Sequence, residues 1–345
     1  MTNNTKVGVL GATGNVGQRF IQLLDDHPWF ELASVTASES SAGNAYSDVV
    51  DWRLDSRLPE MAKELEVGET QPGDVDDDVE IVFSALPSSA AKEVEPAFAD
   101  DGYIVASNAG WGRMKDDVPL VIPEINPDHL DLLEVQSDER GWDGGIVKNP
   151  NCSAITMTPT IAALREFGLS RVVVATLQAV SGAGYSGVSS MEILDNVIPY
   201  ISNEEKKMET EPLKILGEFD GSEIDEAEIG ISASCNRVAT FDGHLENVWG
   251  ELDEDPTAEE IKEAFRDFTT LDLPTAPDQT IIVHDEPDRP QPRLDRNAGN
   301  GMSVSVGRVR DDTKGTKYSC LAHNTVRGAA GASLLNAEVI AERIL

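Results

Sequence analysis

Short apolar runs alternate with amphipathic stretches through the first part of the chain. Four runs have the length and the branched side chains of buried strands: Lys6–Leu10, Glu31–Thr36, Glu80–Ala85 and Tyr103–Ser107. Stretches with helical periodicity lie between them at Gln18–Asp26 and Glu93–Asp101. Because strands and helices alternate, we predict a parallel sheet with crossover helices.

The pattern changes near residue 150. A chain of 345 residues is longer than the about 250 to 300 residues that one hydrophobic core normally serves, so we expect two domains, 1–150 and 151–325. The second should be of the α+β class, with three recognisable elements: a helix from Cys152 that Gly168 ends, a strand at Arg171–Gln178 and a helix at Glu259–Phe268. Without a low-complexity linker between them, the domains should pack tightly.

Two segments near the end of the chain differ in character. Ala276–Gly301 is rich in Pro, Asp and Arg, which predicts an irregular segment. Val326–Leu345 is apolar with helical spacing and predicts a terminal helix. We expect this helix to complete the first domain.

Acidic residues dominate the composition. The chain has 62 Asp and Glu against 27 Lys and Arg, a formal net charge of -35, which argues against binding to nucleic acid or to an anionic membrane. The carboxylates lie in patches along the chain, such as Asp74–Glu80 and Glu251–Asp255, and not in one tail. This distribution indicates a halophile's protein with a surface built for a salt-rich cytosol.

The N-terminal residues and the cysteine content both favour a cytoplasmic protein. The first residues do not resemble a cleaved leader, and no run approaches the about 18 apolar residues of a membrane span, so we expect a cytoplasmic protein. Cys152, Cys235 and Cys320 are far apart and have no CxxC spacing. We therefore expect no metal site and no disulfide framework.

A glycine-rich turn follows the first predicted strand and precedes the first helix. Its residues are Gly11, Ala12, Thr13, Gly14, Asn15, Val16 and Gly17. Such a turn lets the backbone approach a pyrophosphate and directs free helix N–H groups at it. A purely structural turn is the alternative, but the strand before it and the helix after it favour a Rossmann-type dinucleotide site.

The end of the second strand bears on which dinucleotide binds. An Asp or Glu at this position would bind the ribose 2′-hydroxyl of NAD. Here Ser38, Ser40 and Ser41 supply neutral hydroxyls, and Glu39 lies among them. A cofactor with a 2′-phosphate is therefore compatible with this loop.

Cys152 is the first residue of a predicted helix, with Asn151 as a good N-cap. The helix N-terminus should favour the thiolate and offer N–H groups to an oxyanion, as a nucleophile requires. The alternative is an inert buried cysteine, which is the interpretation we prefer for Cys235 and Cys320.

Among five histidines, His244 differs in context, because Arg237 lies seven residues before it. One segment could thus supply an acid-base group and a carboxylate ligand.

Seven motifs occur in order along the chain: GATGNVG, NAGWGRM, NPNCS, QAVSGAGYSG, the E-x-x-K of Glu204–Lys207, CNRVATFDGH and HNTVRGAAGASLLNAE. Together, from about residue 6 to 345, the chain resembles aspartate-semialdehyde dehydrogenase of the archaeal and fungal branch. The resemblance implies a nucleophile at Cys152, a general acid-base at His244 and an orienting side chain at Gln178. It also implies five substrate ligands: Arg113, Asn151, Glu204, Lys207 and Arg237. From spacing alone, Glu204 and Lys207 would be an exposed helix pair.

The resemblance further implies NADP as cofactor, a homodimer or homotetramer, and cofactor contacts beyond the glycine turn and its neighbouring serines, at Ser84, Leu86, Gly182 and Asn336. Related sequences carry basic residues in the loop where this chain has Ser40 and Asn44, which leaves NAD as an alternative. The implied reaction converts β-aspartyl phosphate to aspartate semialdehyde through a cysteine thioester, and supplies lysine, threonine and methionine synthesis.

Three other functions compete with this interpretation. Malonyl-CoA reductase shares the framework, but Arg113, Glu204 and Lys207 favour a phosphate substrate. N-acetyl-glutamyl-phosphate reductase is more distant, because NPNCS and the Gln178 segment do not fit it. A dinucleotide-sensing regulatory protein would need only GATGNVG and would leave the other motifs unexplained.

Overall fold

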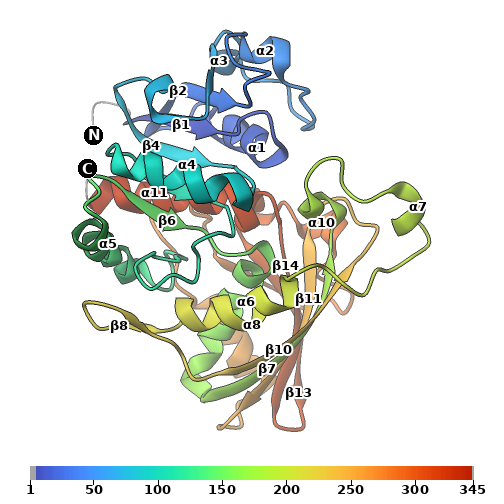
Figure 1. The fold of residues 1–345 in the computed structure, drawn as a ribbon. Helices are drawn as coiled ribbons and strands as arrows, with labels where there is room; N and C mark the ends of the chain where they lie inside the picture. Colours follow the sequence, from blue (N-terminus) through green and yellow to red (C-terminus); the bar gives the residue numbers. More distant parts are fainter. Residues whose placement is uncertain (1–4, 344–345) are drawn as a thin grey trace.

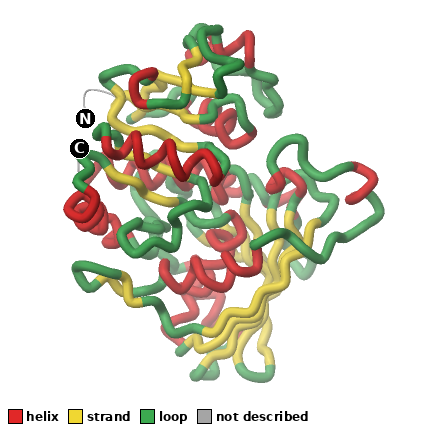
Figure 2. Tube along the Cα trace, in the orientation of Figure 1, coloured by secondary structure: helices red, strands yellow, loops and turns green. Residues whose placement is uncertain are grey.

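The computed structural model describes residues 5–343 and contains two six-stranded sheets (Figures 1 and 2). The first sheet has the order β3-β2-β1-β4-β5-β6, and every neighbouring pair is parallel. Its strands are β1 (Thr5–Leu10), β2 (Phe30–Ala37), β3 (Val67–Glu69), β4 (Val79–Ser84), β5 (Ile104–Ser107) and β6 (Gly145–Lys148). The predicted parallel α/β architecture is confirmed.

Helices cover both faces of this sheet. Helices α1 (Asn15–Leu24) and α11 (Gly331–Arg343) share one apolar cluster with β1 and β4, in which Phe20 stacks on Phe83 at 4.8 Å. Helix α4 (Ser88–Asp100) packs on the other face through Phe98. Helix α5 (Leu132–Arg140) contacts β6 at the edge. The terminal helix thus returns to the first sheet, as predicted.

The second sheet is mixed, in the order β10-β7-β11-β14-β13-β12. Its strands are β7 (Leu169–Gln178), β10 (Gly230–Arg237), β11 (His244–Leu252), β12 (Ile281–His284), β13 (Val304–Asp312) and β14 (Gly315–Ala322). Helices α6 (Cys152–Ala163), α8 (Glu204–Ile215) and α9 (Ala258–Arg266) bury one face of it through a single apolar cluster. In Figure 1 no long helix of the described chain covers the opposite face; one short helix, Pro292–Asp295, contacts β14 there.

Four short elements and one small ribbon occupy the connections. They are α2 (Tyr46–Val49), α3 (Glu60–Lys63), α7 (Ser190–Ile193), α10 (Pro292–Asp295) and the pair β8 (Glu218–Phe219) with β9 (Ile224–Asp225). The prediction that 276–301 is irregular was partly wrong. Strand β12 lies in this stretch, because its Ile281 is buried and pairs with Val304 of β13 at the edge of the sheet.

Two helix predictions are refined by the structure. Helix α6 ends at Ala163, and a 3-10 turn continues to Gly168, whose φ of +72° closes the segment as predicted. The terminal helix begins with a π-helical turn, Val326–Ala330, before α11. Gly328 in that turn lies against Cys152, where an added Cβ would come within 2.7 Å of the cysteine Cβ. Residues 1–4 and 344–345, which both belong to the first predicted domain, lie outside the described chain.

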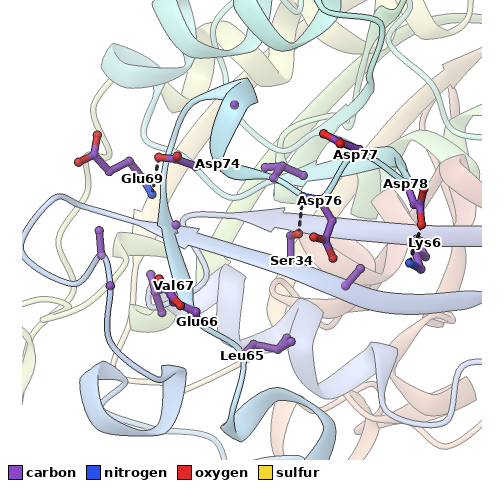
Figure 3. A pocket seen from close by; sticks show the side chains of 16 residues that line it. Lys6, Ser34, Leu65, Glu66, Val67, Glu69, Asp74, Asp76, Asp77 and Asp78 are labelled. Atoms are coloured by element: carbon purple, nitrogen blue, oxygen red, sulfur yellow. Dashed lines mark hydrogen bonds and ion pairs between the residues drawn. The ribbon is translucent and has the colours of Figure 1, made fainter.

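A wide hollow on the first domain is lined by acidic side chains (Figure 3). It lies beside β2 and β3 and includes Asp74, Asp76, Asp77, Asp78, Glu66 and Glu69. Lys6 pairs with Asp78 at 3.0 Å and is the only basic residue of the lining. None of the expected site residues lies in this hollow, which is unsuited to an anionic ligand. In residues 5–343, no helix combines the length and apolarity needed to cross a bilayer.

We predict that KCl stabilises the folded chain. Screening shortens from about 10 Å at 0.1 M to about 3 Å at 1 M, so molar salt removes most of the repulsion among carboxylates such as those in Figure 3. Salt also screens the few cations that would bind an anionic substrate, but many more carboxylates act on stability. Thermal unfolding across a KCl series measures the effect. A midpoint that stays flat or falls with salt would contradict the halophilic interpretation.

Candidate active site

Cys152 is the first residue of α6, at the junction between the two sheets. Asn151 caps the helix as predicted, since its Oδ1 accepts hydrogen bonds from the N–H groups of Ser153 (2.9 Å) and Ala154 (3.1 Å). No acidic residue lies in the first turn. The positive end of the helix is therefore directed at the Cys152 thiol.

His244, the first residue of β11, brings its imidazole to Cys152. The distance from His244 Nε2 to Cys152 Sγ is 3.3 Å. On the other side of the ring, Nδ1 accepts a hydrogen bond from the backbone N–H of Ala179 at 3.1 Å. A neutral imidazole that accepts at Nδ1 carries its proton on Nε2. The ring thus presents a donor to the sulfur.

Burial keeps both reacting groups uncharged in the free chain. It raises the pKa of the Cys152 thiol to about 12, and the Glu204 carboxylate adds to this effect, while Lys207, Arg113 and Arg237 oppose it. Burial also lowers the pKa of His244 to about 3. The helix N-terminus was expected to favour the thiolate, but in the free chain burial has the larger effect and raises the pKa of the thiol.

Glu204 connects the nucleophile's helix cap to the second sheet. Its Oε1 accepts hydrogen bonds from Asn151 Nδ2 and Gln178 Nε2, both at 2.9 Å, and its Oε2 pairs with Lys207 at 3.0 Å. Burial opposes ionisation of this carboxyl, but Lys207, Asn151 and Gln178 outweigh it and lower the pKa. Glu204 is only 6% exposed. The pair is therefore part of the site and not an exposed helix pair.

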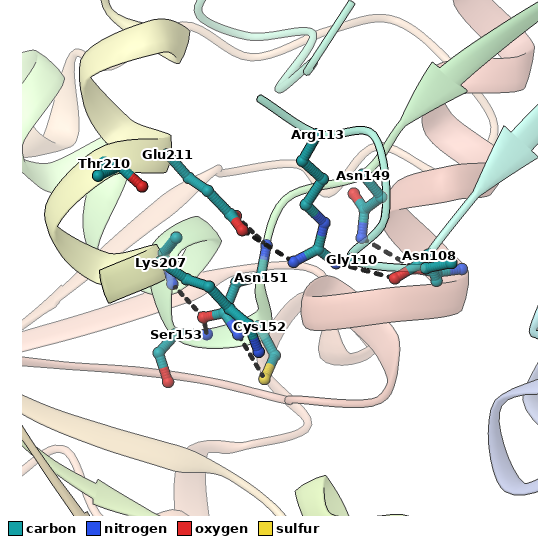
Figure 4. A network of polar contacts seen from close by, with 12 residues as sticks. Asn108, Gly110, Arg113, Asn149, Asn151, Cys152, Ser153, Lys207, Thr210 and Glu211 are labelled. Atoms are coloured by element: carbon teal, nitrogen blue, oxygen red, sulfur yellow. Dashed lines mark hydrogen bonds and ion pairs between the residues drawn. The ribbon is translucent and has the colours of Figure 1, made fainter. Parts of the chain in front are cut away.

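Arg113 is held by a partner that the sequence did not reveal (Figure 4). Its Nη1 donates to Glu211 Oε1 at 3.0 Å, and its Nη2 donates to the carbonyl of Asn108 at 2.8 Å. The other oxygen of Glu211 accepts from the backbone N–H of Asn151 at 2.6 Å. Glu211 thus links the arginine to the loop that carries the cysteine. Lying seven residues after Glu204 on α8, it shares that helix face, which was the available signal.

Arg237 is the last residue of β10, and its guanidinium and the His244 imidazole both lie against Gly182. Its Nη1 donates to the carbonyl of Ala179 at 2.7 Å. Gly182 leaves room for both side chains, because an added Cβ would come within 3.0 Å of Arg237 Nη1 and 3.1 Å of His244 Cε1. A larger residue at position 182 would displace the His244 imidazole or the Arg237 guanidinium.

One hollow of about 610 Å³ joins Cys152, Arg113 and Lys207 to the glycine turn, whereas Glu204, Arg237 and His244 are not part of its lining. We call it the Cys152 hollow; its lining includes Asn15, Val16, Ser88, Ser89, Asn108, Gly110, Trp111, Arg113, Asn151, Cys152, Ser181, Gly182, Lys207, Asn324 and Gly328. Ser88, Ser89, Trp111 and Asn324 were not predicted. The sequence offered a signal for Trp111 and Asn324, which lie within the motifs NAGWGRM and HNTVRGAAGASLLNAE, but none for Ser88 and Ser89.

The glycine turn has the geometry of a phosphate cradle. Gly14 is the N-cap of α1, with no side chain closing the helix end, so the first N–H groups of α1 face the hollow at Asn15 and Val16. Gly17 permits the close packing of helix and strand, because an added Cβ would lie 2.3 Å from the carbonyl oxygen of Gly11. The N–H groups of Gly11 and Ala12 bond to the carbonyl of Thr36 at the end of β2.

Several expected cofactor residues occupy other environments. Ser84 is fully buried and donates to Glu95, which also pairs with buried Lys148, so its hydroxyl is already used. Asn336 is buried on α11 and donates to the carbonyl of Val121, outside the Cys152 hollow. Thr13 lies within the turn, where its carbonyl accepts a hydrogen bond from Gln18, and Leu86 lies against Gly11. Ser38 and Ser40 are exposed and share a hydrogen bond of 3.0 Å, with Ser41 beside them.

Comparisons with known proteins agree with this geometry. Residues 6–133 match the family described as "Semialdehyde dehydrogenase, NAD binding domain", and residues 161–327 match "Semialdehyde dehydrogenase, dimerisation domain". The chain is 58% identical to aspartate-semialdehyde dehydrogenase of Archaeoglobus fulgidus, over 98% of this chain and 99% of that protein. The chain belongs to the aspartate-semialdehyde dehydrogenase family. The resemblance to archaeal and fungal members is thereby confirmed.

Other relatives extend this placement in the aspartate-semialdehyde dehydrogenase family. The enzyme of Methanothermobacter thermautotrophicus is 54% identical over 97% of this chain and 99% of that protein. A crystal structure of the Candida albicans enzyme with NADP has a TM-score of 0.89 and 41% identity, covering 98% of this chain and 99% of that one. That of Vibrio cholerae aspartate semialdehyde dehydrogenase II complexed with ASA has a TM-score of 0.80, 26% identity and full coverage of both chains.

Proposed function

We propose that this chain catalyses the reversible, NADP-dependent reductive dephosphorylation of β-aspartyl phosphate to aspartate semialdehyde, in the synthesis of lysine, threonine and methionine. The observation that carries the proposal is the 3.3 Å approach of His244 Nε2 to Cys152 Sγ at a helix N-terminus. A cysteine in this arrangement is suited to attack a carbonyl carbon. Membership of the family supplies the reaction.

The chemistry proceeds through a covalent bond to Cys152. In the biosynthetic direction, Sγ attacks the acyl carbon of the substrate, inorganic phosphate leaves, and a thioester remains. Bound NADPH supplies the hydride that reduces this thioester. The C–S bond of the resulting thiohemiacetal then breaks, which releases the aldehyde and returns Cys152.

In this scheme His244 acts as a hydrogen-bond donor and general acid, which is one part of the expected acid-base role. Because Ala179 N–H occupies Nδ1, Nε2 donates a hydrogen bond, first to the sulfur and then to the oxyanion that forms on the acyl carbon. At the start of α6 the backbone N–H of Cys152 would donate to the same oxyanion, because Asn151 Oδ1 already accepts from the N–H groups of Ser153 and Ala154. The Cys152 thiol passes its proton to solvent as the substrate binds, because His244 already carries a proton on Nε2, and three nearby cations favour the thiolate.

The substrate's charged groups match the side chains around Cys152. We assign the α-carboxylate to Arg237, whose planar guanidinium suits a bidentate pair. The amino group would bind Glu204, which is held ionised by its neighbours. The phosphate would bind Arg113 and Lys207, which both line the Cys152 hollow. Gln178 and Asn151 would orient the intermediate through their bonds to Glu204.

NADP fits the glycine turn and the Cys152 hollow. The uncapped start of α1 suits the pyrophosphate, and the space kept by Gly11, Gly14 and Gly17 allows its close approach. The hydroxyls of Ser38, Ser40 and Ser41 are neutral donors for a 2′-phosphate. NAD remains the alternative cofactor, because this loop places no cation among these serines.

We predict that Ser40→Arg tightens NADP binding and leaves NAD binding unchanged. The added guanidinium would pair with the 2′-phosphate that NAD lacks, a charge-assisted bond. Affinities for both cofactors, measured by fluorescence titration, give the result, with Ser40→Gln as an uncharged control of similar length. If the native chain prefers NAD severalfold in kcat/KM, the serine loop has been misinterpreted.

The competing reaction is tested by one paired assay. Aspartate semialdehyde with NADP should give phosphate-dependent formation of NADPH, whereas malonate semialdehyde with CoA should give no turnover. The opposite result would assign the chain to malonyl-CoA reductase chemistry. Cofactor binding without turnover of either substrate would favour a dinucleotide-sensing protein.

We also propose a homodimer, or a homotetramer built from it, that works in the cytoplasm, where Cys152 stays reduced. The domains would divide at residue 150, with 326–345 completing the first, and the open face of the second sheet would join the subunits. Exposed apolar side chains beside this sheet support the assignment: Tyr185, Met191, Leu194, Val197, Tyr200 and Trp249. Sedimentation analysis should give twice or four times the 37.2 kDa chain mass. A monomer would contradict this proposal.

A further inference from the structure

A carboxyl group with no charged partner lies beneath the active site. Glu246 is on β11, two residues after His244, so both side chains leave the strand on the same face. This face packs against α6, whose first turn carries Cys152 and Ser153. Glu246 is 0% exposed, and no lysine, arginine or histidine of residues 5–343 forms an ion pair with it.

The groups that surround Glu246 leave it uncharged. The Sγ atom of Cys320, on β14, lies 3.9 Å from Glu246 Oε2. On the other side of β11, Thr176 of β7 is the residue that pairs with Glu246 in the sheet. Burial raises the pKa of this carboxyl well above its usual value, the Ser153 hydroxyl opposes the shift, and the Glu204 carboxylate adds to it. The other titratable groups that interact with it, Cys235 of β10 and Tyr318 and Cys320 of β14, are acids with raised pKa values. None of them supplies a positive charge.

An ionised Glu246 would work against catalysis. A second buried carboxylate would repel Glu204 and disfavour the thiolate of Cys152. It would also stabilise a cationic His244, whose role here requires a neutral ring. The site thus depends on Glu246 keeping its proton, which gives the group a hydroxyl that can donate.

The available partner for that hydroxyl is on α6. Ser153 Oγ and Glu246 Oε1 are both buried, and neither has a hydrogen-bond partner among the described residues. Thr176, by contrast, already donates to Gln178 and accepts from the N–H of Asn236. Buried polar atoms rarely stay unpaired, so a small shift of the first turn of α6 would satisfy both.

We propose that Glu246 is a positioning residue that acts as an uncharged carboxylic acid and, through Ser153, ties the first turn of α6 to β11. This link keeps Cys152 and His244 at their reacting distance. The inference rests on the proposed roles of these two residues. Glu246 itself does not touch the substrate.

The substitution Glu246→Gln tests whether Glu246 acts as an uncharged carboxylic acid or as a carboxylate. Glutamine is neutral, of the same size and able to donate, so kcat should stay within about threefold of wild type. Glu246→Leu keeps the volume but removes the link, and should lower kcat by about 10²-fold through misplacement of Cys152. Glu251→Gln, at a half-buried position near the far end of the same strand where the carboxylate pairs with Arg171, is the matched control and should leave kcat and the alkylation profile unchanged.

Two further measurements do not depend on turnover. Difference infrared spectra of wild type and Glu246→Gln should contain the carbonyl band of a protonated carboxylic acid near neutral pH. The pH profile of Cys152 alkylation should be the same in both proteins. Both measurements test the protonation of Glu246 even if the chain does not catalyse the proposed reaction. A missing acid band, or an alkylation profile shifted to lower pH in Glu246→Gln, would show an ionised carboxylate and overturn the proposal. Wild-type kcat in Glu246→Leu would overturn it as well.

Discussion

Cys152→Ala should abolish turnover while cofactor affinity changes by no more than a few fold. The substitution removes the only atom that can form the thioester, and no other described cysteine lines the Cys152 hollow. The glycine turn lies on the other sheet and keeps its geometry. Steady-state assays in both directions and a titration with NADP give the two quantities.

The other two cysteines provide matched controls. Cys235→Ala and Cys320→Ala remove buried thiols of the second sheet, and both variants should retain turnover after any loss of stability is allowed for. Near wild-type activity in Cys152→Ala would refute the covalent mechanism. A loss of cofactor binding equal to the loss of turnover would show that the substitution disturbs the fold instead.

His244→Asn should lower kcat by about 10² to 10⁴, the usual contribution of a general acid or base. Asparagine cannot place a donor where Nε2 lies, 3.3 Å from Cys152 Sγ. The fold should persist, because Gly243 and the strand pairing of β11 are unaffected. Unchanged turnover would remove His244 from the mechanism.

The pH dependence of kcat/KM should reflect the lowered pKa of His244. Since burial lowers the pKa of His244 to about 3, the ring stays neutral from neutral pH down to about pH 4, and kcat/KM should show no histidine limb near the ordinary pKa of about 6.5. Any rise toward alkaline pH would come from the raised pKa of Cys152. A limb near pH 6.5 that disappears in His244→Asn would contradict the neutral donor.

The first domain could be predicted from the sequence because its pattern is local. Its strands are buried on both faces, so they occur as continuous apolar runs between helices. In the second sheet one face is open, and β10 consists largely of small and polar residues, Gly230–Arg237. Such strands are defined by their neighbours in the sheet. The sequence therefore predicted β7 and left β10 to β14 unassigned.

The site residues also divide into those that a local sequence pattern shows and those that only contacts between distant segments show. Cys152, Asn151 and the glycine turn follow from helix caps and strand-helix order, which the sequence displays. Glu211 and Glu246 were missed, because a glutamate on a helix or strand is ordinarily at the surface. Only contacts between distant segments show that these two are buried. The raised pKa of Cys152 escaped prediction for that reason too.

The covalent intermediate can be trapped and located directly. The chain would be mixed with aspartate semialdehyde and NADP in phosphate-free buffer, quenched with acid and analysed by peptide mass spectrometry. The mechanism predicts an aspartyl thioester on the peptide that contains Cys152, formed together with one equivalent of NADPH and released when phosphate is added before the quench. An adduct on Cys235 or Cys320, or NADPH formation without any adduct that phosphate releases, would contradict it.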